Sequence, residues 1–339
     1  MPPSPDISVV MSTYNRCGLL PGALESVLAQ ETDGVGYEVI VVDNNSTDQT
    51  REVVEAFRAR GHARLRYIFE AKQGVSYGRN AGIAAARAPL IAFTDDDVRA
   101  ATDWVLSIKR AFDAHPEVDC VGGKVLPQWP SDPPAWLTRD HWPPLALVDH
   151  GEAEFYTNFS RPICIVGANL ALRREVFDEI GLFAPKFQLV KDGLGATEDY
   201  ELQRRLWQSG RQGRYVPGIV VTADVQAERL TKTYHRRWHQ GHGGRFAEMR
   251  LNEIEQSRAR LFDVPAHFYN QAIRNAAAWL MSTLSGDEAQ AFYHETKLHF
   301  IIGFLRRRRQ DYRAEQVHGA LHELARFAWA FATKSREQL

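Results

Sequence analysis

The sequence predicts an α/β protein with a Rossmann-like, mostly parallel sheet flanked by helices, followed by a helical C-terminal extension. Two observations carry this prediction. Up to about residue 225, short β-branched runs alternate with helical stretches, and this alternation implies crossover connections between parallel strands. From residue 230 onward only helical patterns remain. We therefore expect an α/β domain over residues 1–225 and a helical region over residues 226–339.

In the first half of the α/β domain, strands are expected at residues 7–11, 38–42, 65–69 and 90–94, and helices at residues 19–30, 48–60, 77–87 and 104–114. Residues 38–42 form a nearly continuous apolar run, which is typical of a strand buried on both faces. Ser46 and Thr47 precede the second helix and are expected to cap its N-terminus.

The second half is less regular. A strand at 119–125 leads into residues 128–151, which are rich in proline, carry three tryptophans and suggest a lid or a disordered loop. Order is expected to resume at 163–172, followed by a helix at 174–180, a mobile segment at 186–196, a helix at 198–209 and a strand at 213–221. The extension should contain helices at 231–250, 265–284, 287–306 and 311–334.

Composition bounds the class of protein. Of 339 residues, 44% are hydrophobic and 24% are charged, which is typical of a globular chain, and the net charge of -1 gives no reason to expect a nucleic-acid partner. The three scattered cysteines lack zinc-site spacing and favour reduced thiols in the cytoplasm. The N-terminus does not read as a signal peptide, and no apolar run approaches the ~20 residues of a spanning helix. We expect a cytoplasmic protein.

The charge is unevenly distributed. From Val225 to the end there are 18 Lys/Arg and 12 Asp/Glu, a net charge of +6, which leaves -7 for the preceding residues. An apolar stretch from Leu298 to Leu305 runs into four arginines that end at Arg309. A basic run of this kind is usually a solvated helix end. Beside an apolar helix face it can also dock on an anionic membrane, so peripheral contact with the inner membrane face through Leu298 to Arg309 is an open alternative.

Three polar clusters follow expected strands: Thr13-Tyr14-Asn15, Asp43-Asn44-Asn45 and Asp95-Asp96-Asp97. In an open parallel sheet, ligands bind beyond the carboxyl ends of the strands. Any one cluster has an alternative reading as a turn or helix cap. Because the three should converge on one edge of the sheet, a binding site is the better interpretation.

The aspartate triplet indicates a divalent cation. Adjacent carboxylates repel one another unless a cation neutralises them, and oxygen ligands suit Mg²⁺ or Mn²⁺. Such an ion, held by Asp95 and Asp97, would bind a diphosphate. Lys72, Gly74 and Arg79 surround the start of the preceding helix and offer cationic and backbone contacts to phosphate.

Two further acids, Glu198 and Asp199, begin a helix after a glycine-bearing loop. They are either a pair favoured by the helix dipole or a general base that deprotonates an acceptor hydroxyl. Their position along the chain does not choose between the two.

Several of these stretches together resemble the family 2 glycosyltransferases with a GT-A fold, including rhamnosyl- and glucosyltransferase-like members. The matching runs begin at Ser8, Val41, Arg79, Phe93, Gly167 and Glu198, and read SVVMSTYNR, VVDNNSTD, RNAGI, FTDDD, GAN and EDYEL. They occur in the family's order and spacing from Ile7 to about Arg245.

The resemblance implies a role for each matching residue. Asp199, with Glu198 beside it, would be the catalytic base, and Asp95 and Asp97 would hold Mn²⁺ or Mg²⁺. Asp43 would hydrogen-bond the uracil of a UDP-sugar, although members that use guanosine or thymidine nucleotides keep similar residues. The nucleotide site as a whole would comprise Thr13, Tyr14, Asn15, Arg16, Asp43, Asn45, Lys72, Gly74, Arg79, Asn80, Asp95 and Asp96.

The implied reaction is a single in-line displacement that inverts the anomeric centre. The implied acceptor is a hydroxyl group, on a lipid-linked molecule among other options, in glycan, glycolipid or polysaccharide synthesis. The residues name neither the donor sugar nor the acceptor, and they do not indicate an oligomeric state.

Two departures from the family pattern stand out. Many members carry a metal-binding histidine in the strand after the Glu-Asp helix, whereas residues 221–225 contain none. Either Asp224 or water would take its place, or the metal would be held more loosely. Residues 234–238 resemble the QxxRW motif of processive members with Tyr234 in place of glutamine, which indicates a non-processive relative. Trp238, His239 and His242 would then approach the acceptor or diphosphate, or simply belong to a structural helix.

Two other functions would also suit an α/β protein that binds a nucleotide-sugar. A sugar-phosphate nucleotidylyltransferase would need a glycine-rich loop after the first strand, but no glycine occurs there before Gly18. A non-catalytic nucleotide-sugar or carbohydrate-binding protein would not need the intact Asp95–97 and Glu198-Asp199 acids. Both alternatives are therefore less favoured than a transferase.

Overall fold

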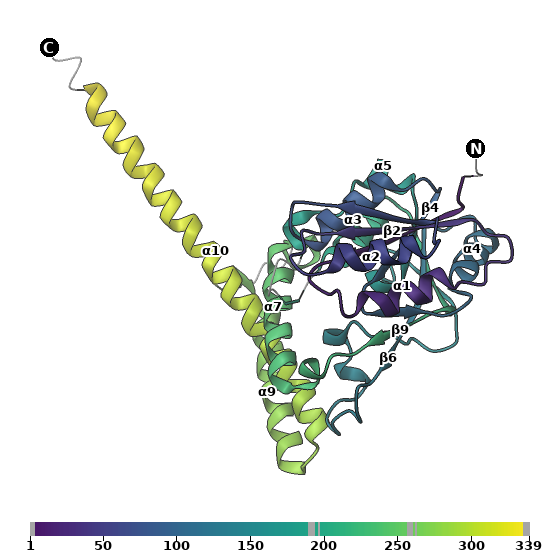
Figure 1. Cartoon of the computed structure of the whole chain (residues 1–339). Coiled ribbons are helices and arrows are strands. Elements are labelled where there is room, and N and C mark those ends of the chain that lie inside the picture. Colours follow the sequence, from purple (N-terminus) through teal and green to yellow (C-terminus); the bar gives the residue numbers. More distant parts are fainter. Residues whose placement is uncertain (1–3, 189–193, 196, 256–259, 262, 335–339) are drawn as a thin grey trace. The chain divides into compact units, whose positions relative to one another are not determined.

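The computed structural model describes residues 4–188, 194–195, 197–255, 260–261 and 263–334, with side chains described up to residue 314 (Figure 1). The chain forms two compact units, Met1–His235 and Arg236–Leu339, and each is described by itself. The boundary between them falls within helix α7 (Lys232–Glu248), whereas the sequence placed a domain boundary after residue 225.

The first unit contains a nine-stranded sheet with the order β3-β2-β1-β4-β8-β6-β9-β5, and β7 pairs with β9. One group of strands runs in a single direction: β1 (Ile7–Thr13), β2 (Tyr37–Asp43), β3 (Leu65–Phe69), β4 (Leu90–Asp95), β6 (Cys120–Gln128) and β9 (Gly213–Asp224). The opposite direction is taken by β5 (Val98–Ala100), β7 (Phe155–Thr157) and β8 (Leu170–Arg173). The expected mostly parallel sheet is confirmed.

The short antiparallel strands are where the sequence prediction differs most from the structure. Order was expected to resume at residues 163–172, and the structure forms a 3-10 turn at Gly167–Asn169 there, followed directly by β8. The strands β5 and β7 were not expected because three residues are too few to show an alternating pattern.

The α-helices that lie wholly within the described part of the first unit are α1 (Leu20–Leu28), α2 (Thr50–Ala59), α3 (Val75–Ala85), α4 (Trp104–Ala114), α5 (Val176–Ile180) and α6 (Glu198–Gln208). The expected caps of α2 are wrong, because its N-cap is Gln49 and makes no side-chain cap. Ser46 and Thr47 instead bond to Asn15 in the loop after β1, so their polar groups join two loops.

The core of this unit follows from the alternation of side chains along the strands. Val10, Ile40 and Phe93 point to one face of the sheet and share a buried cluster with residues of α3, α5 and α6. Their sequence neighbours Val9 and Val39 are equally buried although they point the other way. Both faces of the central strands are therefore covered, as the continuous apolar runs indicated.

The proline-rich segment 128–151 is folded rather than open. It forms two 3-10 turns, Arg139–His141 and Pro143–Leu145, and Val148 pairs with Val125 of β6. Trp136 is buried, with its ring edge-on to the imidazole of His141. Of the segment that was expected to be mobile, residues 186–196, most lies outside the described residues; the described part begins with a 3-10 turn at Pro185–Phe187.

The second unit consists of most of α7 together with α8 (Asn252–Glu255), β10 (Arg260–Leu261), β11 (Val264–Pro265), α9 (Ala266–Ser285) and α10 (Glu288–Lys334). The sequence prediction of two helices at 287–306 and 311–334 is wrong, since α10 is continuous (Figure 1). The linking residues contain no glycine or proline, and an ion pair between Arg307 and Asp311, one helical turn apart, supports the continuity. Among the described residues, no helix combines the length and the apolar character needed to cross a membrane.

Candidate active site

Three strand ends bring the predicted polar clusters to the same edge of the sheet. β1 lies between β2 and β4, with Thr13 in register with Asp43 and Ser12 in register with Asp95. Because all three strands run in the same direction, the residues that follow them form one continuous surface. This convergence was expected from the sequence, and the structure produces it.

Hydrogen bonds connect the loop after β1 to the loop after β2. Asn15 and Asn45 adopt left-handed backbone conformations with φ of 51° and 66°, which asparagine tolerates better than most residues. The amide of Asn15 donates to Ser46 Oγ at 3.0 Å, and the amide of Thr47 donates to Asn15 Oδ1 at 2.7 Å. Tyr14 is exposed beside these bonds, so its ring is available to a ligand.

Asp43 is held by two donors at the end of β2. Its carboxylate accepts hydrogen bonds from the Tyr67 hydroxyl at 2.7 Å and from the Ser46 amide at 2.9 Å. Burial, together with the bond to Asp43, raises the pKa of Tyr67. Tyr67 was not identified from the sequence, because nothing in the pattern of β3 distinguishes it from another strand residue.

Gly74 begins α3 with φ of 137°, a conformation that favours glycine. A side chain there would overlap the amide of Gln188, whose Oε1 accepts a hydrogen bond from the Ser76 amide at 2.9 Å. The amide of Gly74 itself donates to Asn44 Oδ1 at 2.6 Å. The glycine is therefore required by packing within the protein, and Lys72 beside it is exposed.

The aspartate triplet is neutralised from within the chain. Arg16 Nη1 lies 2.9 Å from Asp96 Oδ1 and 2.8 Å from Asp97 Oδ2. Burial raises the pKa of Asp96 to about 6, against the lowering effect of the Arg16 charge. Burial also raises the pKa of Asp95, the most exposed carboxylate of the three. Arg16, expected to contact nucleotide, is thus engaged with the carboxylates.

Arg79 connects the two acidic motifs. Its guanidinium lies 2.6 Å from Asp199 Oδ1, 3.4 Å from Glu198 Oε1 and 3.6 Å from Asp95 Oδ1, and its side chain is only 6% exposed. A buried arginine is stable only when it is paired. The pairing therefore joins the start of α6 to the end of β4, although these residues are more than a hundred positions apart in the sequence.

Asp199 is oriented by two donors. Oδ1 accepts from Arg79, and Oδ2 accepts from the Gly167 amide at 2.8 Å. A side chain at position 167 would lie 2.5 Å from Arg79 Nη2 and 2.6 Å from Asp199, so only glycine leaves room for this arrangement. Two donors, one to each oxygen, fix the direction of the carboxylate.

Glu198 has a different environment from its neighbour. It is buried, and its Oε2 has no hydrogen-bond partner among the described residues. Burial first, and the charge of Asp199 second, raise its pKa to about 8, while Arg79 opposes the shift. At neutral pH this side chain is mainly a carboxylic acid and therefore a hydrogen-bond donor, so Asp199 is the better candidate for a base.

We expect Glu198→Gln to change how stability depends on pH. A raised pKa in the folded state means that the protonated form stabilises the protein fully below the ordinary value of 4.5, and that this contribution disappears as the pH rises towards about 8. Asp96 behaves similarly only up to about pH 6. The stability of the variant relative to wild type should thus increase between pH 6 and 8, measured by urea unfolding. The exposed Glu25→Gln is the control, and parallel curves for wild type and Glu198→Gln would contradict the prediction.

A divalent cation is compatible with the oxygen atoms near the aspartates. Among the described residues there is no group of three or more His, Cys, Asp and Glu side chains arranged to hold a metal ion. Asp95 and Asp97 nevertheless offer two hard oxygen ligands, which suits Mg²⁺ or Mn²⁺ with the remaining ligands from phosphate and water. Gln226, which the sequence analysis missed, places its amide nitrogen 3.3 Å from Asp97 Oδ2, and its buried Oε1 has no partner among the described residues.

The suggested substitute for the missing histidine is otherwise engaged. The Asp224 carboxylate accepts from Arg99 at 2.9 and 3.3 Å, and its backbone amide donates to the Asp97 carbonyl at 2.8 Å. Asp224 thus supports the backbone at Asp97 and pairs with an arginine.

Asn80 and the predicted α7 residues have partners within their own units. Asn80 exchanges two hydrogen bonds with the backbone of Phe183, so its amide has a structural partner. Trp238, His239 and His242 belong to the second unit, where the Trp238 and His242 rings stack at 4.6 Å and His239 is buried. Their contact with an acceptor or diphosphate stays a prediction.

The match to a known family lies within the first unit. The family described as Glycosyl transferase family 2 matches residues 8–181, just over half of the chain. Validoxylamine A glucosyltransferase of Streptomyces hygroscopicus subsp. jinggangensis is 41% identical over 109 residues, or 32% of this chain and 25% of that protein. Glucosyl-dolichyl phosphate glucuronosyltransferase of Haloferax volcanii is 30% identical over 178 residues, or 52% of this chain and 55% of that protein. The chain thus spans from a quarter to just over half of these relatives.

Solved structures share the fold at low identity. Mannosyltransferase PcManGT from Pyrobaculum calidifontis, in complex with GDP-Man and Mn²⁺, has a TM-score of 0.60 and 19% identity, covering 90% of this chain and 88% of its own. Staphylococcus aureus TarS in complex with UDP has a TM-score of 0.51 and 16% identity, covering 91% and 92%. The expected GT-A fold is therefore confirmed.

Proposed function

Because the chain belongs to glycosyl transferase family 2, we propose that it transfers a sugar from a nucleotide-sugar donor to a hydroxyl acceptor with inversion of the anomeric centre. The observation that carries this proposal is the buried Arg79 bridge between Asp199 and Asp95. The shared arginine supports the proposal because a displacement reaction between two substrates requires the base and the donor-binding carboxylate to lie close together.

The donor would lie along the loops after β1 and β2. Tyr14 offers an exposed ring to the nucleobase, and Asp43 is fixed in position by Tyr67 to accept a hydrogen bond from it. Asp95 and Asp97 would hold a divalent cation, which when bound supplies positive charge to the diphosphate as its leaving group departs. The Gln226 amide oxygen is a further ligand candidate. The neighbouring folds were solved with GDP-Man or with UDP, so guanosine and uridine donors are both proposed.

Asp199 would act on the acceptor. Its carboxylate takes the proton of the acceptor hydroxyl while the oxygen forms a bond to the anomeric carbon, and the bond from that carbon to the diphosphate oxygen breaks. Arg79 and the Gly167 amide hold the carboxylate in a fixed orientation. Glu198, protonated beside it, avoids placing a second negative charge against the base.

The acceptor is proposed only as a hydroxyl group. The two relatives compared above are named for different compounds, validoxylamine A and glucosyl-dolichyl phosphate. A role in glycan, glycolipid or polysaccharide synthesis is part of this proposal, with a lipid-linked acceptor as one option that the dolichyl phosphate in the second name supports.

The proposal is tested by thermal stabilisation with UDP, GDP, dTDP and CDP, each with and without Mn²⁺. A nucleotide at 100 times its dissociation constant should add about 2.7 kcal/mol to the free energy of unfolding. We expect one nucleotide to stabilise the wild type in a Mn²⁺-dependent manner, and Asp97→Ala to lose most of that effect.

Two further variants control this experiment. Asp97 pairs with Arg16, so its replacement can also lower the melting temperature without ligand; Asp95→Ala removes a more exposed carboxylate and should give the same loss of stabilisation. Asp113→Ala removes an exposed carboxylate on α4 and should bind as the wild type does. If no nucleotide stabilises the wild type, the proposed donor site is wrong.

A further inference from the structure

Helix α9 carries a stripe of large apolar side chains on its exposed side. The stripe consists of Ile273, Ala277, Leu280, Met281 and Leu284, at the spacing of one helix face. Its large members are 69% (Ile273), 50% (Leu280), 66% (Met281) and 74% (Leu284) exposed. Monomeric proteins rarely expose a contiguous apolar patch of this kind unless it binds something.

The opposite side of α9 packs within the second unit, where the buried Phe268 stacks its ring on that of Phe304 at 4.0 Å. Asn275 faces α10, where its Oδ1 lies 3.1 Å from His294 Nδ1, and the small residues Ala272 and Ser282 are partly buried. α9 is thus apolar on two sides, whereas a helix that only covered its own unit would be apolar on its inward side alone. The outward stripe therefore indicates that another apolar surface covers α9.

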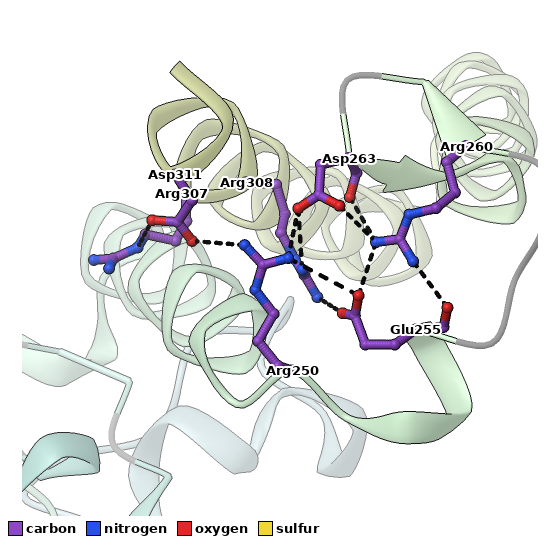
Figure 2. Close-up of polar contacts among 7 residues, drawn as sticks. All are labelled: Arg250, Glu255, Arg260, Asp263, Arg307, Arg308 and Asp311. Carbon is purple, nitrogen blue, oxygen red and sulfur yellow. Dashed lines mark hydrogen bonds and ion pairs between the residues drawn. The ribbon is translucent and has the colours of Figure 1, made fainter. Parts of the chain in front are cut away.

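The charged residues near the α9 stripe do not favour binding to an anionic lipid surface. Two arginines of the basic run that suggested membrane docking form ion pairs with acidic residues inside the second unit, as Figure 2 shows. Arg308 is fully buried and pairs with Glu255 and Asp263, and Arg307 pairs with Glu248 and Asp311. The turn that follows the stripe carries Asp287, whose negative charge an anionic membrane would repel.

The same charges favour a second copy of the chain. The exposed Arg274 lies near one end of the stripe, and the exposed Asp287 follows the other end. In an antiparallel pair with Ile273 opposite Leu284 of the second copy, Arg274 would lie about 6 Å along the axis from Asp287 of that copy. A two-fold axis repeats this contact at both ends, while the stripe between them has no charges to repel.

We propose that the α9 stripe is a homodimer interface in which the two α9 helices pack antiparallel. The proposal does not depend on the transferase function. Its core would be the four large stripe side chains from each copy, with the Arg274–Asp287 contacts at its rim.

Sedimentation velocity over roughly 1–100 μM tests the interface, a range that includes the weaker affinities of protein interfaces. We expect the wild type to form dimers within this range. Met281→Glu places a charge at the centre of the stripe and should raise the dimer dissociation constant at least about 100-fold. Gln271→Glu adds the same charge to an exposed position of α9 outside the stripe and should leave the dimer intact. Equal melting temperatures of the two variants at low concentration establish that both are folded.

Cysteine pairing tests the orientation. Ile273→Cys and Leu284→Cys proteins, distinguished by a tag and mixed under mild oxidation, should form the mixed disulfide rather than either self-linked dimer, with the wild type as the background control. A wild type that stays monomeric, a dimer unaffected by Met281→Glu, or preferential self-linking would overturn the proposal. So would flotation of the wild type with phosphatidylcholine–phosphatidylglycerol vesicles that Met281→Glu abolishes, since the stripe would then be a lipid-binding surface.

Discussion

Replacing Asp199 with asparagine is expected to reduce sugar transfer by about 10²–10⁴-fold while nucleotide binding is retained. The amide keeps the shape of the carboxylate but cannot take a proton from the acceptor. Asp95 and Asp97, the proposed donor carboxylates, are untouched. The rate is measured as release of nucleoside diphosphate from the donor, with water as a slow acceptor. Nucleotide binding is measured by thermal stabilisation.

Asp113→Asn is the matched control, because it makes the same chemical change at an exposed position of α4. It should transfer at the wild-type rate. An Asp199→Asn protein that also transfers at that rate would exclude Asp199 as the base. Loss of both binding and turnover would instead indicate that the Arg79 bridge collapses without the carboxylate charge.

Asn169→Ala is expected to lower the free energy of unfolding by about 3–5 kcal/mol, since each buried polar group left without a partner costs about 1–3 kcal/mol. The Asn169 side chain accepts from Trp104 Nε1 at 2.8 Å and donates to the Lys124 and Ile219 carbonyls, both at 2.9 Å. It is almost completely buried and joins α4, β6 and β9. Urea unfolding measures the change.

Asn270→Ala is the control for this variant. Asn270 is exposed on α9, so its replacement should change the free energy of unfolding by less than about 0.5 kcal/mol. A loss below about 1 kcal/mol for Asn169→Ala would mean that the three freed groups find other partners, for example water. The Gly-Ala-Asn run that resembled the family motif would then have no structural role at its asparagine.

The location of the candidate site could be predicted from local patterns. Apolar runs mark where a strand ends, and parallel strands necessarily present their carboxyl ends at one edge. Thr13, Asp43 and Asp95 therefore had to lie close together once the strands were assigned. The order of motifs likewise sufficed to identify the family, because each motif is read within a few neighbouring residues.

The partners of those residues could not be predicted in this way. Arg16 reaches Asp97, Arg79 reaches Asp199, and Tyr67 reaches Asp43 across distances in sequence that no local period describes. Each contact depends on how a helix or loop packs on the sheet and on which rotamer that packing allows. A basic residue in the sequence is therefore compatible with a phosphate contact, a carboxylate pair or a solvated surface until its neighbours are known.

The C-terminal region also has some properties that the sequence predicts and others that only the tertiary structure decides. Its helical character and its positive charge follow from composition and periodicity, which are properties of the chain alone. Whether Arg308 faces solvent or is buried depends on Glu255 and Asp263, which reach it from α8 and the segment between β10 and β11 (Figure 2). The burial of a charge is set by the groups that surround it in space, because only their charges and hydrogen bonds can offset its loss of water.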